Sequence, residues 1–458
     1  MNNFDKWRDY TSGLSSPQNY IDWSWLYLVG AALQRRVWLG PTHQPCFPNK
    51  YVIFVGDPGI GKGLPINQVL SFMRNWKRKD AIRLNAEGTG LAAKDIENAN
   101  LVMDGELQKA SEKEYQGKAK GNKDVIEPLL FPMAADATTY EALTMAVGDS
   151  FRMCNFISTK PDGTNKLDWY GHSSLCFVLP ELASLFRKRT EDTINYMLGL
   201  YDCPLDYEYD TLTRGKDRVR RGCLNVLAGT TPSFMQSTFD DRLADEGFNS
   251  RTFYVYAREN RKNQFFIPAL SAEQEKHKID LLNHIRQLSA LYGNVKVDQD
   301  TWQYLQDWWD EQERNKNSRV NKSVKLKPYY SRRNIHVMKM AMAFHFSESL
   351  EMFIPLETFK QTISFLEAEE KNMHLAINMG GDTPEAKMCI KIMESISGCQ
   401  KNIVELLIDT RKYGNKDLLY NCLDTLEETG EILKIRVPDE ITKQPQLYWK
   451  MKEKNNEK

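Results

Sequence analysis

Short runs dominated by apolar residues mark the first two thirds of the chain. They occupy residues 51–55, 175–179, 224–228 and 252–256. Their apolar positions are continuous rather than alternating, which is typical of strands covered by helices on both faces. The runs therefore predict an α/β domain built around a central parallel sheet. A helical region is expected before this domain in the sequence.

After Pro268 the apolar positions recur at the spacing of helices, as at Trp302, Leu305 and Trp308. Near the end, a helix closed by Gly430 precedes two strand-like runs, which predicts a winged helix-turn-helix. The expected domains are an N-terminal helical region at 1–47, the α/β core at 48–267, a helical lid at 268–380 and the winged helix at 381–458.

A strand, a glycine-rich turn and a helix-forming stretch follow one another at residues 51–72. Small residues in such a turn let successive N–H groups converge on phosphate oxygens, and Lys62 reaches the terminal phosphates. The pattern is that of a phosphate-binding P-loop, so a nucleoside triphosphate is the expected ligand. The residues expected around it are Gly56, Asp57, Pro58, Gly59, Ile60, Gly61, Lys62, Gly63 and Leu64.

The expected metal site departs from the usual pattern at two positions. Gly63 stands where a Ser or Thr normally ligates Mg²⁺. Glu181 follows the 175–179 run and is the candidate carboxylate for orienting the attacking water, but Pro180 replaces the Asp that usually precedes it. Either Mg²⁺ is held by phosphates, water and Glu181 alone, or hydrolysis is weakened. The alternative role for Glu181 is to stabilise a helix start.

Further candidate catalytic residues follow in order. Thr230 comes at the end of the strand predicted at Leu224–Gly229 and is placed to hydrogen-bond the γ-phosphate or the water. Arg251 precedes the last run, and either Arg332 or Arg333 is a candidate to fold onto the phosphates from the helical lid. Each of these residues taken alone also fits a surface or packing role.

In this order the parts resemble those of the AAA+ ATPases. The resemblance assigns Walker A to Gly56–Lys62, Walker B to Leu175–Glu181, sensor 1 to Thr230, the arginine finger to Arg251 and sensor 2 to Arg332 or Arg333. Within that class the chain looks most like helicase-like proteins of phages and mobile elements, related to minichromosome-maintenance and superfamily 3 helicases.

The resemblance covers roughly residues 20–350 and implies ATP and Mg²⁺ as ligands and a homo-oligomer, expected to be a hexameric ring. An arginine finger acts on the nucleotide of a neighbouring subunit. Three residues depart from the family pattern: Gly63, Pro180 and Thr230, the last at a position where such families usually carry Asn. These departures bear on metal binding and turnover rather than on fold.

Three stretches are candidates for binding single-stranded DNA. Residues 207–221 predict a hairpin with a basic tip, carrying Arg214, Lys216 and Arg218, which related helicases place in the ring channel. A loop at 158–166 adds Lys160 and Lys166, and the basic stretch 314–333 is a third candidate. A solvated surface hairpin and a charged linker are the alternatives.

The predicted winged helix offers a duplex-binding or partner-binding surface. Its recognition helix carries Asp424, Glu427 and Glu428, which favours contact with a replication protein or a weak DNA role.

Composition adds limits. Among 458 residues, 61 basic and 61 acidic side chains balance, so binding to nucleic acid must depend on local patches. The eight cysteines and seven histidines show no metal-ligand spacing, so no metal ligands are expected among them, and the cysteines fit a reduced cytoplasmic protein. No secretory signal is expected. The apolar run Trp23–Leu33 is too short to cross a membrane and is predicted to form a buried helix before the strand at 51–55.

The expected function is an ATP-driven helicase or translocase ring in phage or mobile-element DNA replication. The alternatives are a nucleotide-switched initiator or helicase loader, and a nucleotide-binding oligomer with little ATPase activity.

Overall fold

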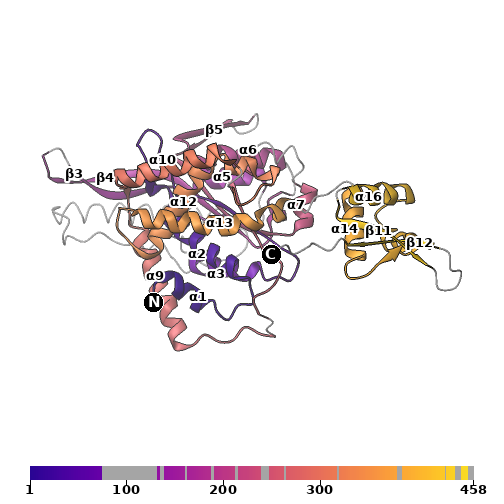
Figure 1. Cartoon of the computed structure of the whole chain (residues 1–458). Coiled ribbons are helices and arrows are strands. Elements are labelled where there is room, and N and C mark those ends of the chain that lie inside the picture. Colours follow the sequence, from indigo (N-terminus) through magenta and orange to yellow (C-terminus); the bar gives the residue numbers. More distant parts are fainter. Residues whose placement is uncertain are drawn as a thin grey trace, which may run out of the picture. The chain divides into compact units, whose positions relative to one another are not determined.

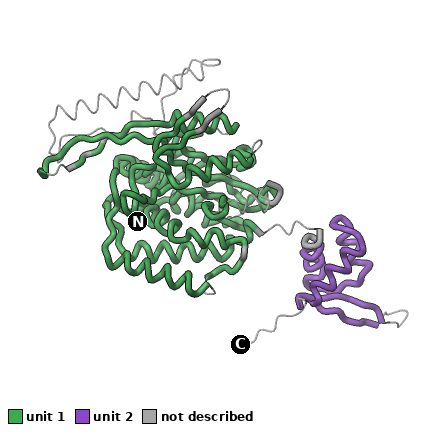
Figure 2. The backbone as a smooth tube through the Cα atoms, turned by 90° about the horizontal axis from the view of Figure 1, so that it is seen from above, with its two compact units in different colours: residues 1–377 green, residues 378–458 purple. Residues whose placement is uncertain are grey.

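The computed structural model forms two compact units, residues 1–377 and 378–458 (Figure 2). The structure describes residues 1–74, 131–134, 139–159, 162–186, 190–211, 215–238, 247–262, 265–316, 319–378, 384–428, 430–438 and 445–451.

The first unit begins with two helices, α1 (Asn3–Tyr10) and α2 (Gln18–Leu33). Every residue of α2 from Tyr20 onward is buried, because the helix is apolar on all sides and packs between the sheet and the helices α3, α9 and α12. The prediction of a buried helix at Trp23–Leu33 is confirmed.

A sheet of five strands, in the order β3-β4-β7-β2-β8, forms the centre of this unit. Strands β4, β7, β2 and β8 are mutually parallel, whereas β3 runs antiparallel to β4. The sheet is therefore mixed, which corrects the prediction of a purely parallel one. Its strands are β2 (Tyr51–Val55), β3 (Phe151–Thr159), β4 (Asn165–Leu179), β7 (Gly222–Thr230) and β8 (Thr252–Tyr256).

The register aligns the ends of the parallel strands. Val55 pairs with both Thr230 and Tyr256, and Leu179 pairs with Ala228. We call this end of the sheet, where the chain leaves β2, β4, β7 and β8, the carboxyl edge. The opposite end, where β2 and β8 begin, we call the amino edge. In open α/β sheets ligands bind beyond the carboxyl ends of the strands.

Helices surround the sheet, and α10, α12 and α13 run side by side over it (Figure 1). Arg333 of α12 joins them, because it donates to Gln312 of α10 and to Glu370 of α13. The described α-helices of this layer and around it are α3 (Gly63–Arg74), α5 (Tyr140–Asp149), α6 (Thr190–Tyr201), α7 (Pro232–Thr238), α9 (Ala272–Leu288), α10 (Gln299–Arg314), α11 (Lys327–Tyr330), α12 (Arg333–Glu348) and α13 (Leu356–Asn378).

Two small sheets complete the first unit. Strands β1 (Val37–Leu39) and β9 (Gly293–Val295) pair in parallel. Strands β5 (Asp206–Thr211) and β6 (Gly215–Arg220) form a hairpin between α6 and β7. Thr211 pairs with Gly215, so Lys216 and Arg218 lie in β6 and not in the predicted basic tip.

The second unit packs three helices against a three-stranded antiparallel sheet in the order β10-β12-β11. Met388, Leu406, Leu419, Leu423 and Trp449 belong to its buried core. The elements are α14 (Pro384–Ser395), β10 (Lys401–Asn402), α15 (Ile403–Thr410), α16 (Lys416–Glu428), β11 (Ile432–Pro438) and β12 (Pro445–Met451).

Candidate functional site

The predicted P-loop lies at the carboxyl edge, between β2 and α3. Gly59 and Gly61 both have φ of +86°, a conformation that other residues rarely adopt. A Cβ on Gly56 would approach Tyr20 Oη at 2.7 Å and the Ala257 carbonyl oxygen at 2.9 Å. The glycines at these positions are therefore required by backbone conformation and by close packing.

The segment before α2 and the one after β8 support the loop. Ser16 Oγ donates to the Gly61 carbonyl at 2.7 Å, and Tyr20 Oη donates to the Val55 carbonyl at 2.7 Å. Asn260 Nδ2 lies 3.5 Å from the Gly59 carbonyl. No sequence motif includes Ser16, and only its contact with Gly61 in the fold identifies it.

Lys62 occupies the position expected of a phosphate-binding lysine. Its Nζ donates to the carbonyls of Gly56 at 2.6 Å and Asp57 at 2.9 Å, so the ammonium is folded back on its own loop. Burial lowers the pKa of Lys62, and the negative charges of Glu181 and Asp57 oppose that shift. A phosphate group at the loop would offer stronger, charged acceptors in place of these carbonyls.

The end of β7 joins the P-loop to the candidate catalytic residues. A Cβ on Gly229 would lie 2.6 Å from the Pro180 carbonyl oxygen and 3.4 Å from Lys62 Cβ. The next residue, Thr230, accepts a hydrogen bond from the Gly56 N–H through its carbonyl at 3.3 Å. The structure thus brings Lys62, Thr230 and the chain leading into Glu181 together at one edge.

Thr230 and Glu181 differ in their surroundings. Thr230 Oγ1 is buried and has no hydrogen-bond partner within the described part of the chain. Glu181 is exposed, immediately before the short helix Leu182–Ser184, and its carbonyl accepts from the N–H and Oγ of Ser184. A buried hydroxyl without a partner costs free energy, so Thr230 is well suited to bind a ligand atom.

The expected Mg²⁺ would find few protein ligands here. The described residues contain no group of three or more His, Cys, Asp or Glu side chains able to hold a metal ion. At Gly63 an added Cβ would meet nothing within 4 Å, and its φ is not in the left-handed region. Mg²⁺ accepts phosphate and water ligands readily, so the site fits an ion held mainly by the nucleotide and by Glu181.

A second cluster lies at the amino edge. Arg251 Nη2 lies 3.2 Å from Asp202 Oδ2, and Arg332 Nη1 lies 3.0 Å from Asp202 Oδ1. Burial alone would raise the pKa of Asp202, but the hydrogen bond and charge of Arg332 and the charges of Arg251 and Lys339 hold it below its usual value. No motif or spacing points to Asp202, because its partners are 49 and 130 positions away in the chain.

The two clusters are separated by the length of the strands. Tyr51 pairs with Thr252 and Val55 with Tyr256, so about 13 Å of strand, at ~3.3 Å per residue, separates their levels. Arg251 and Arg332 lie beyond one end of this span and Lys62 beyond the other. This placement contradicts the expectation that Arg332 folds onto the phosphates bound by its own chain.

Arg333 is also removed from the candidate phosphate-binding residues. Its guanidinium is buried and donates to Glu370 at 2.8 and 2.9 Å, to Gln312 at 2.8 Å and to Glu367 at 3.3 Å. With these acceptors it ties α12 to α10 and α13, so its role is structural.

The candidate DNA-binding residues are differently placed. Arg218 of β6 forms an ion pair with Asp206 at 2.9 Å, and Lys166 of β4 forms one with Asp168 at 2.7 Å. Both charges are therefore partly neutralised within their own hairpins. Arg214 and Lys160 lie outside the described residues, as does the side chain of Lys216.

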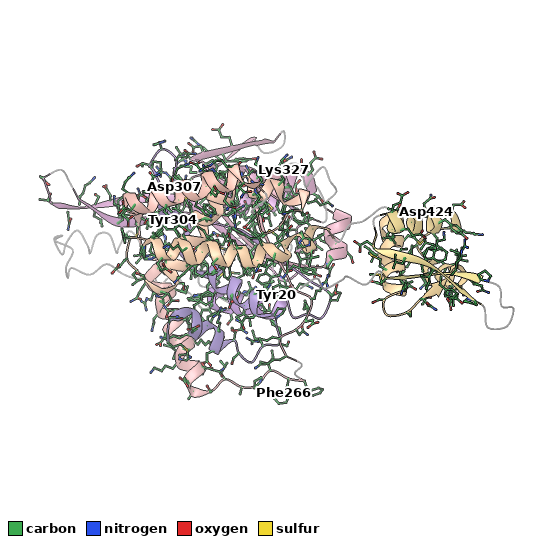
Figure 3. The ribbon with its side chains drawn as sticks, in the orientation of Figure 1. Tyr20, Phe266, Tyr304, Asp307, Lys327 and Asp424 are labelled. Carbon is green, nitrogen blue, oxygen red and sulfur yellow. The ribbon has the colours of Figure 1, made fainter. Side chains whose placement is uncertain are left out.

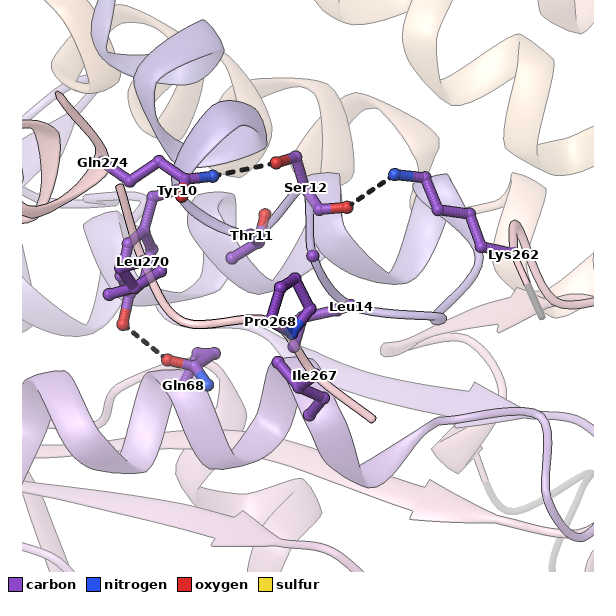
Figure 4. A pocket seen from close by; sticks show the side chains of 11 residues that line it. Tyr10, Thr11, Ser12, Leu14, Gln68, Lys262, Ile267, Pro268, Leu270 and Gln274 are labelled. Carbon is purple, nitrogen blue, oxygen red and sulfur yellow. Dashed lines mark hydrogen bonds between the residues drawn. The ribbon is translucent and has the colours of Figure 1, made fainter. Parts of the chain in front are cut away.

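A pocket of about 270 Å³ lies beside α3, away from the P-loop (Figure 4). Tyr10 Oη donates to Gln68 Oε1 at 2.6 Å across one side, and Lys262 Nζ donates to the Ser12 carbonyl at 3.1 Å on the other. No residue from 56 to 62 lines it. Its lining is Tyr10, Thr11, Ser12, Gly13, Leu14, Gln68, Lys262, Ile267, Pro268, Leu270 and Gln274.

Neither the models of known protein families nor the curated proteins give a match to this chain. In the described part of the chain no helix is both long and apolar enough to span a bilayer.

Proposed function

We propose that the chain is an AAA+ P-loop ATPase that assembles head to tail into a ring, expected to be a hexamer, and translocates on single-stranded DNA in phage or mobile-element replication. The observation that carries the proposal is the division of the site. Lys62 and Thr230 meet at the carboxyl edge, whereas Arg251 lies at the amino edge, out of reach of its own P-loop.

ATP binding is supported by the conformation of the loop. Glycines with positive φ open the backbone, α3 directs its amino end toward the loop, and Lys62 is adjacent. In this proposal Glu181 orients the attacking water and Thr230 binds the γ-phosphate or that water. Mg²⁺, when bound, neutralises charge between the terminal phosphates, and Lys62 orients them from the loop.

Oligomerisation is supported by the position of Arg251. An arginine acts on a developing phosphate charge only within direct reach. A head-to-tail contact would bring the amino edge of one copy to the carboxyl edge of the next, and such contacts generate rings when they close.

DNA binding is supported less directly. The β5–β6 hairpin lies in the chain between α6 and β7, the strand that ends at Thr230. We propose that Arg214, which lies between the two strands in the sequence, and Lys216, near the start of β6, follow the phosphate backbone. Arg218 contributes less, because Asp206 already neutralises it.

For the second unit we propose a winged helix-turn-helix that binds a replication protein. The order helix, strand, helix, helix, strand, strand supports the fold. The acidic side chain Asp424 points outward from α16 (Figure 3), which disfavours a DNA phosphate backbone as the partner of that helix.

One assay separates this proposal from its rivals. Steady-state ATPase activity is measured with and without single-stranded DNA, alongside unwinding of a forked duplex. DNA stimulation with unwinding supports the motor, and stimulation without unwinding supports an initiator or helicase loader. The absence of both stimulation and unwinding would support an oligomer that binds nucleotide without appreciable turnover.

The hairpin is tested by replacing Arg214, Lys216 and Arg218 together with Ala. Affinity for single-stranded DNA should fall and its salt dependence should flatten, because fewer counterions are released on binding. The single variant Arg218→Ala is the matched control, expected to bind almost as the wild type does because of the ion pair with Asp206. An unchanged salt slope in the triple variant, with the oligomer intact, would assign DNA binding to the 314–333 stretch instead.

A further inference from the structure

The amino edge holds more positive than negative charge around one carboxylate. The positive charges of Arg251, Arg332 and Lys339 all lower the pKa of Asp202. Arg332 contributes two contacts, at 3.0 and 3.4 Å, and Arg251 contributes one at 3.2 Å. One carboxylate cannot neutralise three cations, so this cluster suits an additional anion.

The hydrogen-bond donors of this cluster differ in whether they already have acceptors. Lys339 Nζ is buried and occupied by the Phe47 carbonyl at 2.9 Å and Asn49 Oδ1 at 2.6 Å. Arg251 Nε, by contrast, is buried with no hydrogen-bond partner in the described part of the chain. The side chains of Arg251 and Arg332 are 16% and 29% exposed and that of Asp202 is 54% exposed, so the arginines are reachable from outside.

Asp202 also occupies a junction in the fold. It follows the last residue of α6, and the chain then enters the β5–β6 hairpin at Asp206. The linking residues are fixed, because Arg35 Nη2 donates to the Cys203 carbonyl at 2.6 Å and the Arg221 N–H donates to the Leu205 carbonyl at 2.6 Å. Asp202 therefore lies four residues before the first strand of the hairpin, on a segment that is held at both Cys203 and Leu205.

We propose that Asp202 is a positioning residue that holds Arg251 and Arg332 until the triphosphate of a neighbouring subunit displaces it. The inference rests on the proposed function, because it requires a neighbour that presents a P-loop. A phosphate carries more charge than a carboxylate and offers more acceptor oxygens to two guanidinium groups. Displacement frees Asp202 at the base of the hairpin and so links the nucleotide bound by one subunit to the DNA-binding element of the next.

The test is Asp202→Asn, which keeps the side-chain shape and removes the competing charge. Binding of a fluorescent, non-hydrolysable ATP analogue is measured at protein concentrations below and above the concentration at which the oligomer assembles. Above assembly the variant should bind roughly fivefold more tightly than the wild type, because two partly exposed ion pairs no longer compete. Below assembly the two proteins should bind alike. In turnover assays KM should fall while kcat stays within about twofold.

Asp206→Asn is the matched control. It makes the same change in charge four residues away, but its partner is Arg218 in the hairpin. Its nucleotide affinity should equal that of the wild type at both concentrations. Asp202→Glu keeps the charge and should also resemble the wild type.

The Arg332→Gln variant tests the same ion pair through its arginine partner. Its result does not depend on how well the Asp202 variant folds. It removes one of the two arginines without touching the P-loop, so it should weaken analogue binding only above assembly. The double variant Asp202→Asn, Arg332→Gln then measures the coupling between the two residues.

Several results would overturn the inference. These are unchanged affinity of Asp202→Asn above assembly, an equal gain at both concentrations, or an Arg332→Gln variant that binds like the wild type above assembly. If the wild type binds no analogue at any concentration, the proposed function itself fails. A wild type whose affinity rises on assembly, together with an unresponsive Asp202→Asn, defeats the role of Asp202 alone.

Discussion

The two edges of the central sheet carry opposite arrangements of positively charged groups. At the carboxyl edge Lys62 donates to two backbone carbonyls of its own loop, and the hydroxyl of Thr230 has no hydrogen-bond partner among the described residues. At the amino edge Arg251 and Arg332 are held by a charged group, the carboxylate of Asp202. The lysine of the carboxyl edge is thus paired with neutral backbone acceptors, whereas the arginines of the amino edge are already paired with an anion.

This difference indicates how a complete site would form. Lys62 and the two arginines cannot reach one nucleotide within a single chain, because the strands lie between them. A contact between copies would unite the edges and exchange the carboxylate of Asp202 for a phosphate. The predictions that follow remove one edge at a time, beginning with the largest expected effect.

Removing the lysine of the carboxyl edge should have the largest effect. Lys62→Ala should reduce ATP turnover by roughly 10³-fold or more and weaken ATP binding, because the remaining loop donors are neutral N–H groups. Turnover and nucleotide affinity are measured against Asn67→Ala, a change at an exposed position of the same helix. ATP affinity equal to that of the wild type in Lys62→Ala would contradict the P-loop assignment.

Removing the arginine of the amino edge should cost nearly as much, although it lies across the sheet. Arg251→Ala should lower turnover by roughly 10³-fold if the residue acts on a neighbour's phosphate. Arg286→Ala on the exposed part of α9 is the control.

Mixing variants decides whether the two edges belong to one composite site. Arg251→Ala and Glu181→Gln subunits each supply what the other lacks, so mixed oligomers should regain part of the activity. Mixtures that stay as inactive as either variant alone would mean that Arg251 acts within its own chain.

The carboxyl edge could largely be predicted from the sequence. The runs at 51–55 and 252–256 match β2 and β8 residue for residue, and the glycine-rich turn lies between β2 and α3 as expected. Local rules are sufficient there, because the strand, the glycines, the lysine and the helix are contiguous. Strand β3 was missed, and β4 begins ten residues before its predicted run, because their outer parts mix polar and apolar residues.

The amino edge could not be predicted in the same way. Arg332 and Arg333 are neighbours in the chain, yet one meets Asp202 and the other is buried against Glu370. Their different roles follow from contacts between distant segments. No periodicity or motif in the sequence encodes such contacts.

The proposed catalytic carboxylate, Glu181, should be the next most sensitive position. Glu181→Gln keeps the side-chain shape but removes the group proposed to orient water, so turnover should fall by roughly 10²-fold with ATP binding little changed. Glu259→Gln is a matched control, because Glu259 is an exposed carboxylate just beyond β8 at the same edge. Equal losses in both variants would point to a general effect of charge, and no loss in Glu181→Gln would assign the role to another residue.

The smallest effect is expected at Gly63, where a hydroxyl would add the missing Mg²⁺ ligand. Gly59 and Gly63 both have open space where a Cβ would be, but only Gly59 has a φ of +86°. Gly63→Ser should therefore leave ATP affinity unchanged and lower the Mg²⁺ concentration needed for half-maximal turnover by roughly two- to fivefold. Gly59→Ser, which forces a left-handed conformation at a cost of about 1–2 kcal/mol, should instead weaken nucleotide binding. Magnesium titrations of turnover and of fluorescent-nucleotide binding distinguish these results. If Gly63→Ser weakens nucleotide binding as much as Gly59→Ser does, the ligand itself must approach the backbone at residue 63. The absence of the usual hydroxyl would then reflect space at the carboxyl edge rather than a different way of holding the metal.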